Sequence, residues 1–204
     1  MVRPPLLVRF LYPGVVWNIP TKEKIVYLTF DDGPVPEVTP KVLEILKQYN
    51  AKATFFCIGE NVKKNPDVYK LIIQNGHAIG NHTFHHYNNW KVKSNLYLKD
   101  VEDASKYIDS KLFRPPYGKL KQQTLFALKK KYRIILWNVI SYDFDNSISK
   151  ETVFNNVIRH TKKGSIIVFH DSIKASENML YALPKVLEYY NDKGFRFEVI
   201  GNFS

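Results

Sequence analysis

Two adjacent carboxylates and a pair of histidines are the first residues in this sequence whose types and spacing could do chemistry. Asp31 and Asp32 follow the apolar run Ile-Val-Tyr-Leu-Thr-Phe and precede Gly-Pro. Asp, Gly and Pro favour turns, so this tetrapeptide alone is more typical of a turn than of a site. His82 and His86 are four residues apart, which would put both imidazoles on one face if the segment were helical. Two imidazoles and one carboxylate would leave open positions for water, as a hydrolytic zinc site requires.

A histidine at the end of an apolar run and an arginine in a proline-rich turn extend the candidate set. His170 follows the run 165–169, where a histidine can be structural or can act as an acid. The stretch 114–118 reads Arg-Pro-Pro-Tyr-Gly and combines a fixed cation with a rigid turn, because each proline restricts its own backbone and the preceding residue. The turn can be an ordinary loop. Alternatively, Arg114 holds a carboxylate and the backbone N–H groups of the turn face an oxyanion.

The elements that must position these residues alternate along the chain. Segments rich in β-branched and aromatic residues predict strands, and amphipathic segments between them predict helices. We predict strands at 24–31, 52–58, 77–80, 112–114, 133–140, 165–170 and 195–199, and helices at 37–49, 64–75, 94–110, 121–131, 150–161 and 176–192. This alternation indicates parallel βα units, either closed into a barrel or open as a doubly wound sheet.

The candidate residues fall at the C-terminal ends of five different predicted strands. They are, in strand order, Asp31 and Asp32, His82 and His86, Arg114, Asp143, and His170. Active sites of βα barrels are assembled at that rim, whereas an open sheet binds ligands chiefly at one switch point. The sequence therefore favours an α/β fold with a barrel-like closure, which about seven strands would leave incomplete.

Length and composition favour one globular domain over 1–204. A chain of 204 residues can bury its own core, and none of its apolar stretches approaches the roughly 20 residues that span a bilayer. Cys57 is the single cysteine, so it cannot form an internal disulfide, and its apolar neighbours predict a buried thiol.

The formal net charge of +11 comes from lysines spread over several segments. That spread is typical of solvated helix faces and argues against a nucleic-acid partner. If the charge is functional, it would attract an anionic substrate or a membrane surface.

The N-terminal segment is a poor signal peptide, because residues 1–20 lack an uninterrupted apolar run and a small-residue cleavage site. We therefore expect 1–23 to be an extension that packs on the domain and the protein to be cytoplasmic. Interfacial contact with a membrane is the alternative for this segment.

Taken together, the motifs resemble the polysaccharide deacetylases of the NodB homology domain, carbohydrate esterase family 4. The resemblance runs from about residue 24 to residue 199 and keeps the family's motif order. The first, second, third and fifth motifs correspond to Thr-Phe-Asp-Asp-Gly-Pro at 29–34, His-Thr-Phe-His-His at 82–86, Arg-Pro-Pro-Tyr-Gly at 114–118 and Ile-Val-Phe-His at 167–170. The resemblance implies a distorted, incomplete (β/α) barrel at 24–199.

The fourth motif departs from the family's commonest pattern of two Asp separated by two residues and followed by Trp. Residues 140–144 read Ile-Ser-Tyr-Asp-Phe, so only the second acid, Asp143, is present. Ile140 replaces the first acid, and Phe144 replaces the Trp that helps line the acetyl pocket in the family. The departure bears on how the substrate fits more than on hydrolysis.

The resemblance implies a metal site and an enzymatic activity. Asp32, His82 and His86 would bind a divalent metal, with zinc as the expected ion. The implied enzyme is a metal-dependent hydrolase that acts on a non-peptide carbon–nitrogen bond. It removes N-acetyl groups from amino-sugar residues of a polysaccharide or glycan, such as N-acetylglucosamine.

The resemblance also implies the catalytic roles. Asp31, steered by Arg114, would accept a proton from the metal-bound water. The backbone N–H of Tyr117 would stabilise the oxyanion together with the metal. His170, kept protonated by Asp143, would protonate the amine leaving group.

Two other functions remain open from the sequence. One is a metal-dependent amidase that acts on a small non-sugar amide. The other is an inactive homologue that binds carbohydrate at the same rim. Metal content and acetate release would separate an enzyme from a binding protein, and a comparison of sugar and non-sugar amides would separate the two enzymes.

Overall fold

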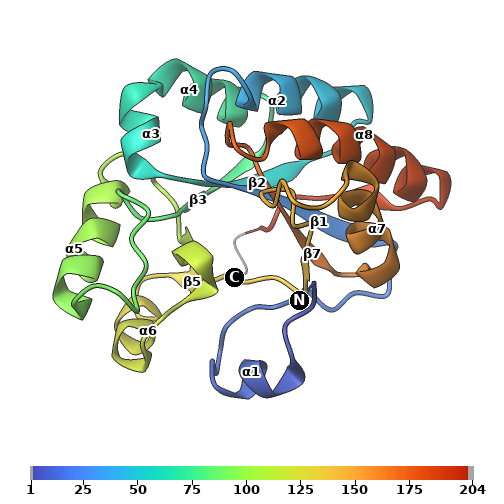
Figure 1. Ribbon diagram of the computed structural model, residues 1–204. Coiled ribbons are helices and arrows are strands. Elements are labelled where there is room, and N and C mark those ends of the chain that lie inside the picture. The colour runs from blue at the N-terminus through green and yellow to red at the C-terminus, as the bar shows by residue number, and fades with distance from the viewer. Residues whose placement is uncertain (1, 202–204) are drawn as a thin grey trace.

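The computed structural model describes residues 2–201 and shows a curled parallel sheet with helices around its outside (Figure 1). The strands are β1 (Ile25–Asp31), β2 (Ala53–Cys57), β3 (Ala78–Asn81), β4 (Leu112–Phe113), β5 (Arg133–Ile134), β6 (Val139–Ile140), β7 (Ile166–His170) and β8 (Arg196–Phe197). The main path runs β5-β4-β3-β2-β1-β7-β6 with every pair parallel, and β8 also pairs with β1. This path ends at β5 and β6. The predicted α/β class and incomplete barrel of about seven parallel strands are confirmed.

The helices lie around the outside of the sheet, with α1 set apart below the others (Figure 1). They are α1 (Leu6–Phe10), α2 (Thr39–Gln48), α3 (Gly59–Lys64), α4 (Pro66–Gln74), α5 (Ser94–Ser105), the 3₁₀ turn η1 (Pro116–Gly118), α6 (Gln122–Leu128), α7 (Lys150–His160) and α8 (Ser176–Asp192). Local sequence signals explain where two of these helices begin. Pro66 opens α4, where its missing N–H costs nothing, and the Ser149 side chain caps α7 by accepting from the Thr152 N–H.

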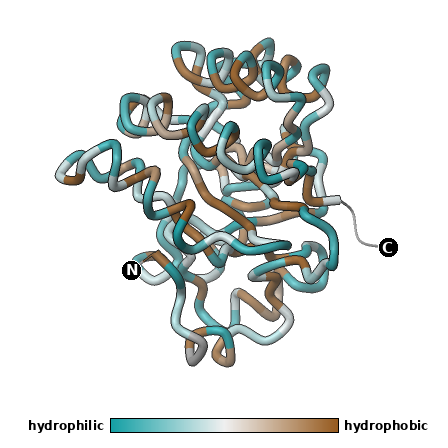
Figure 2. The backbone as a smooth tube through the Cα atoms, turned by 90° about the vertical axis from the view of Figure 1, so that its right-hand side faces the viewer, coloured by the Kyte–Doolittle hydropathy of each residue, from teal (hydrophilic) through white to brown (hydrophobic). Residues whose placement is uncertain are grey.

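The central strand β1 places polar and apolar side chains on opposite faces. Leu28 and Phe30 are fully buried in the core beneath the helices, and the Phe30 ring stacks on Phe55 at 5.0 Å between centroids. Side chains alternate along a strand, so Thr29 and Asp31 point to the other, inner side of the curl. In Figure 2 the brown, hydrophobic strands run through the middle of the molecule, beneath helices of mixed colour.

The prediction of one continuous strand at 133–140 is wrong. It is two short strands, β5 and β6, and the chain between them crosses from one end of the sheet to the other. Ile135 pairs with Val16 of the N-terminal segment, and the Asn138 side chain bonds to Ser165 and to the Ile166 N–H beside β7. These partners are distant in sequence, so the break has no local signal.

Four helices differ from the prediction. Helices α1 and α3 were not predicted, and α4 begins at Pro66 because proline cannot continue the preceding helix. The helix predicted at 94–110 ends at Ser105. The other boundaries agree to within a few residues.

The N-terminal segment contacts the barrel at several points. The Tyr12 hydroxyl donates to the Leu120 carbonyl at 3.1 Å, and the Ile19 N–H donates to the Gly164 carbonyl at 2.9 Å. Residue 1 and residues 202–204 of the predicted domain lie outside the described residues. Within residues 2–201, the helices are too short or too polar to cross a bilayer.

Candidate active site

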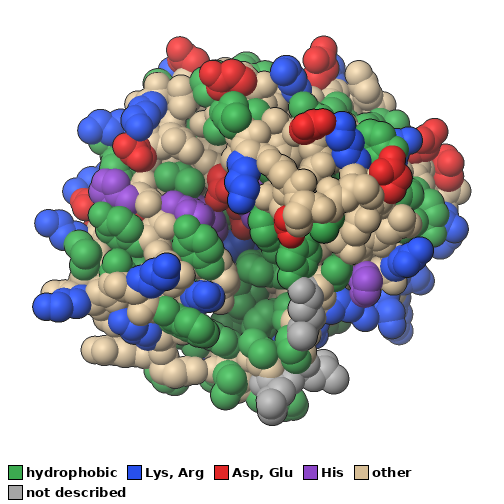
Figure 3. Space-filling view, viewed as in Figure 1, with side chains coloured by type: hydrophobic (Ala, Val, Ile, Leu, Met, Phe, Trp, Pro, Cys, Tyr) green, Lys and Arg blue, Asp and Glu red, His purple; other side chains and the backbone are tan. Residues whose placement is uncertain are grey.

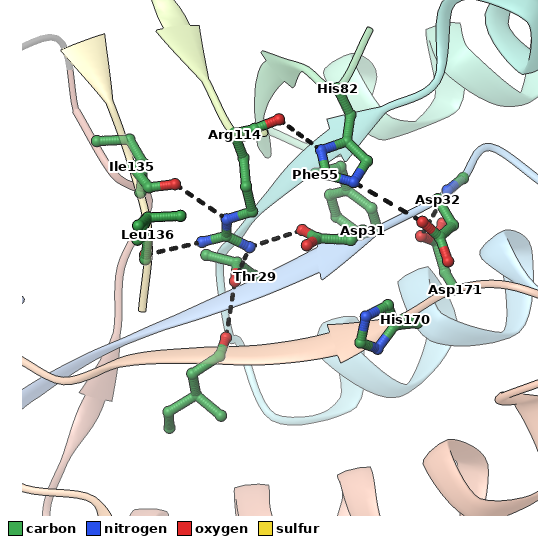
Figure 4. Close-up of polar contacts among 12 residues, drawn as sticks. Thr29, Asp31, Asp32, Phe55, His82, Arg114, Ile135, Leu136, His170 and Asp171 are labelled. Atoms are coloured by element: carbon green, nitrogen blue, oxygen red, sulfur yellow. Dashed lines mark hydrogen bonds and ion pairs between the residues drawn. The ribbon is translucent and has the colours of Figure 1, made fainter. Parts of the chain in front are cut away.

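Asp31 and Asp32 point toward different partners at the end of β1 (Figure 4). Asp31 is the last residue of the strand, and Asp32 has a left-handed φ of 84°, so the chain turns sharply between them. Asp31 faces Arg114 inside the curl, whereas Asp32 faces the histidines. The two adjacent carboxylates therefore serve different partners, an arginine for Asp31 and two histidines for Asp32.

Asp32, His82 and His86 form a cluster whose ligand atoms all lie within 4.8 Å of one another. The Oδ1 of Asp32 is 3.3 Å from Nε2 of His86 and 3.8 Å from Nε2 of His82. This oxygen is buried and has no hydrogen-bond partner among residues 2–201. A buried, unpaired carboxylate oxygen between two imidazole nitrogens is the donor set of a divalent cation site.

The protonation of His82 suits a metal ligand. Its Nδ1 lies 2.7 Å from the Arg114 carbonyl oxygen, which can only accept, so Nδ1 carries the proton and Nε2 presents its lone pair toward Asp32. Burial, with help from the neighbouring His86, holds the pKa of His82 well below its usual value despite the charge of Asp32. His82 is therefore neutral, the form that binds metals.

The loop that carries the two histidines is not a helix, so the helical spacing argument was wrong. Thr83 and His86 have left-handed φ angles of 66° and 57°, and this backbone brings the two imidazole rings to 5.1 Å. The buried Asp100 carboxylate accepts the N–H groups of Phe84 and His85 at 3.0 Å each. The loop conformation is thus held by a helix distant in sequence.

Arg114 is fully buried and its guanidinium is bonded on all sides (Figure 4). Its Nη1 donates to Asp31 Oδ1 at 2.6 Å and to the Thr29 hydroxyl at 2.7 Å. The other nitrogens donate to the carbonyls of Ile135 and Leu136, and the guanidinium lies 4.1 Å from the Phe56 ring centroid. Burial lowers the pKa of Arg114 and Asp31 opposes that shift, but an arginine stays cationic in either case. Asp31 is therefore fixed in direction by a permanent charge.

His170 ends β7 and lies beside Asp31, its register partner on β1. The buried Asp143 carboxylate accepts both the His170 backbone N–H and its Nδ1–H at 2.7 Å, which turns Nε2 toward the site. Burial lowers the pKa of His170, but the charge and hydrogen bond of Asp143, with smaller contributions from Asp32 and Asp31, outweigh it and raise this pKa to about 9. His170 is therefore a cation at neutral pH and can give up a proton.

Aromatic side chains flank the two halves of the site. The Tyr117 ring lies 4.8 Å from the His86 ring, and Tyr117 itself has a left-handed φ of 60°. The Phe144 ring lies 5.1 Å from His170, edge to face. Ile140 pairs with Val168, two residues before His170 on β7, so of the two departures in the fourth motif only Phe144 contacts the acid candidate.

Sequence reasoning missed Asp171, which follows His170 and is fully buried. Its Oδ1 accepts the Gly33 N–H at 3.0 Å, and its Oδ2 accepts the Thr39 hydroxyl at 2.6 Å. Burial raises its pKa to about 8, against these hydrogen bonds. A Cβ at Gly33 would lie 2.0 Å from Oδ2, so glycine is required there. The position of Asp171 at a strand end could have indicated a site residue, whereas Asp100 inside a predicted helix gave no such signal.

The structure thus brings all eight predicted site residues to one end of the sheet. On the face shown in Figure 3, histidines lie beside an acidic and a basic side chain, and hydrophobic side chains line the hollow below them. The arrangement joins a cation site to a fixed carboxylate on one strand and a charged imidazole on the next, which is suited to hydrolysis by general acid–base catalysis.

Comparisons with known proteins support this interpretation. The family model described as polysaccharide deacetylase matches residues 18–133. A peptidoglycan-N-acetylglucosamine deacetylase of Bacillus cereus is 36% identical over 194 residues, covering 91% of each chain. A chitooligosaccharide deacetylase of Azorhizobium caulinodans is 34% identical over 176 residues, covering 82% of this chain and 83% of the relative.

A solved structure gives the same result for the fold. It is a peptidoglycan N-acetylglucosamine deacetylase in complex with 4-naphthalen-1-yl-N-oxidanyl-benzamide, which is 35% identical with a TM-score of 0.88 and covers 97% of this chain and 95% of its own. The motif order, the curled sheet and these matches agree, and the chain belongs to the polysaccharide deacetylase family of the NodB homology domain.

Proposed function

We propose that this chain is a metal-dependent deacetylase that hydrolyses the N-acetyl groups of amino-sugar residues in a glycan. The observation that carries the proposal is the register of β1 and β7, which sets the Arg114-bound Asp31 beside the Asp143-bound His170 next to the Asp32 cluster. A carboxyl group that can accept a proton and an imidazole that can donate one thus lie at one cation site, as amide hydrolysis requires.

Asp32, His82 and His86 would hold the cation. Two imidazoles and one carboxylate with open positions favour zinc, and the neutral state of His82 supports this. A divalent metal bound there would polarise the acetamide carbonyl and lower the pKa of its bound water.

Asp31 acts as the general base. Arg114 holds its Oδ1, so Oδ2 accepts a proton from the attacking water while the new C–O bond forms at the acetyl carbon. The backbone N–H of Tyr117 donates to the oxyanion that develops on the carbonyl oxygen.

His170 acts as the general acid. Its Nδ1–H stays on Asp143, and its Nε2–H is transferred to the sugar nitrogen as the C–N bond breaks. The products are acetate and a free amino sugar, and no covalent intermediate with the enzyme forms.

The acetyl group would be bounded by Phe144, which lies against His170, and by Ile140, which pairs with Val168 two residues earlier on β7. The relatives' names indicate peptidoglycan and chitooligosaccharide as glycans to test first. The net charge of +11 supports an anionic glycan, with an anionic membrane surface as the alternative.

The cytoplasmic location stays a prediction, which cell fractionation would test.

The experiment is acetate release from N-acetylglucosamine oligomers, measured with metal content in the same samples. Chelation should abolish release, and zinc should restore it. Asp32→Asn should lose both metal and activity, because one ligand is neutralised. Asp31→Asn and His170→Ala should keep the metal while turnover falls by about two orders of magnitude or more.

Other outcomes would assign other functions. Full activity in demetallated protein contradicts the metal mechanism, and loss of metal in His170→Ala contradicts the ligand assignment. Equal hydrolysis of simple acetamides indicates a small-amide hydrolase. Glycan binding without acetate release indicates an inactive carbohydrate-binding homologue.

A further inference from the structure

Trp90 is a large apolar side chain that is exposed to solvent on the loop that also carries His86. Its exposed fraction is 57%, and it lies four residues after the metal-site residue His86 on the loop that leads into α5. Lone exposed apolar residues are common on proteins, so exposure alone says little. The contacts around Trp90 are more informative.

The loop under Trp90 is fixed by hydrogen bonds on both sides of the indole. Asn89 is fully buried and its Oδ1 accepts the Lys121 N–H at 2.7 Å, while Lys121 Nζ donates to the Val92 carbonyl at 2.7 Å. The backbone N–H of Trp90 donates to Asn88 Oδ1 at 3.0 Å. Trp90 is thus displayed on a rigid base, which lowers the entropic cost of binding a ligand there.

Lys119 lies over this tryptophan and belongs to the turn that carries Tyr117. Its Nζ lies 5.0 Å from the Trp90 ring centroid, and it follows Tyr117 by two residues on the turn whose tyrosine ring lies against His86. The loop of His86 and the turn of Tyr117 therefore meet a second time, at Trp90 and Lys119. The exposed indole has a cation over it there.

We propose that Trp90 and Lys119 form a second glycan subsite, which binds the sugar next to the residue that is deacetylated. The C–H face of a pyranose packs on the indole, and the ammonium pairs with a carboxylate carried by that sugar or its substituent. The occupant is thus an oligomeric, carboxylate-bearing N-acetylated glycan. This inference rests on the proposed function, because it places the neighbouring acetamide at the metal site.

The test measures binding by calorimetry in zinc-loaded protein that carries Asp31→Asn, so that the probes are not consumed. The probes are N-acetylglucosamine, its neutral tetramer, and the acidic tetramer that alternates N-acetylglucosamine with N-acetylmuramic acid. Trp90→Ala should weaken both tetramers about fivefold or more and leave the monomer unchanged. Lys119→Gln should weaken binding of the acidic tetramer alone, and this effect of the substitution should become smaller at high salt.

Matched variants control for the loss of any exposed ring or charge. Phe126→Ala removes an aromatic ring that is 56% exposed on α6, and Lys41→Gln removes an exposed lysine on α2. Neither should change tetramer binding.

The proposal fails if Trp90→Ala binds the tetramers as the parent does, or if it weakens the monomer equally. The charge pairing fails if Lys119→Gln acts equally on neutral and acidic tetramers. Wild-type protein that releases no acetate, yet binds tetramers through Trp90, would contradict the proposed function and leave the subsite standing. Acetate release by wild-type protein, together with tetramer binding that does not depend on Trp90, would support the proposed function and contradict the subsite.

Discussion

At the scale of single residues, the pair of His170 and Asp143 decides the pH range of the proposed reaction. Asp143 counters the effect of burial and raises the pKa of His170 to about 9. The protonated acid is present below that pKa and is lost as the pH rises through it. A bound divalent cation acts in the opposite direction, so we expect the alkaline limb of kcat/KM at or below about pH 9.

Asp143→Asn should move that limb to lower pH by about one unit and reduce the maximal rate, because the charge is removed with little change in shape. The measurement is a pH profile of kcat/KM for acetate release. An alkaline limb at the wild-type position would show that Asp143 does not set the protonation of His170.

The same pair makes a linked prediction for stability. A histidine whose folded-state pKa is raised contributes stability that is fully present below its unfolded pKa of about 6.5 and disappears as the pH passes about 9. The Tm difference between wild type and Asp143→Asn should therefore be largest near pH 6 and shrink toward pH 9. Thermal unfolding at several pH values measures it.

At the scale of elements, buried carboxylates bind the two loops that carry the proposed metal ligands. Asp171 binds the Gly33 N–H in the loop after β1, and Asp100 on α5 binds the Phe84 and His85 N–H groups and the His85 ring at 2.5 Å. Helix α3 adds to this, since its first N–H groups donate to the carbonyls of Thr83 and Phe84. The positions of the ligands thus depend on groups that touch no metal.

Asp100→Ala should weaken zinc affinity by about 10- to 100-fold, because the histidine loop loses its acceptor. Asp103→Ala is the matched control on the same helix, since its carboxylate only pairs with Lys106 at the surface and should leave the affinity unchanged. Competition titration with a chelating dye measures both. Wild-type affinity in Asp100→Ala would mean that the loop keeps its conformation without this anchor.

At the scale of the whole molecule, the N-terminal segment packs across the sheet where the chain between β5 and β6 crosses it. Val16 pairs with Ile135, Asn18 pairs with Ser165, and Trp17 between them is 9% exposed. The division into an extension at 1–23 and a barrel at 24–199 stays a prediction, and these contacts provide a way to test it.

Trp17→Ala should destabilise the protein by about 3 to 5 kcal/mol and lower Tm by roughly 10 °C, as expected for a large buried aromatic in a chain of this size. Trp90→Ala, which removes the same side chain from an exposed position, should change Tm by only a degree or two. Calorimetric scans of zinc-loaded protein compare the two. Equal Tm values would mean that residues 1–23 do not contribute to the stability of the barrel.

The sequence by itself determined the fold class, and it indicated which residues would meet at one end of the sheet. The alternation of strand and helix patterns predicts parallel βα units, and Asp31, Asp32, Arg114 and His170 could be assigned to one rim because parallel strands end on the same side. The fold class and the common rim could be predicted because each pattern is local and these residues stand at the ends of strands. The catalytic and metal-binding roles of the residues stay predictions.

The tertiary structure alone decided how those residues are held. The histidine loop has left-handed residues and is bound by the Asp100 carboxylate of α5, and the break between β5 and β6 coincides with the pairing of Ile135 with Val16. Asp31 and Asp32 diverge because one is bound by Arg114 from β4 and the other faces His82 and His86 after β3. Each of these features depends on contacts between residues far apart in the chain, which no local pattern encodes.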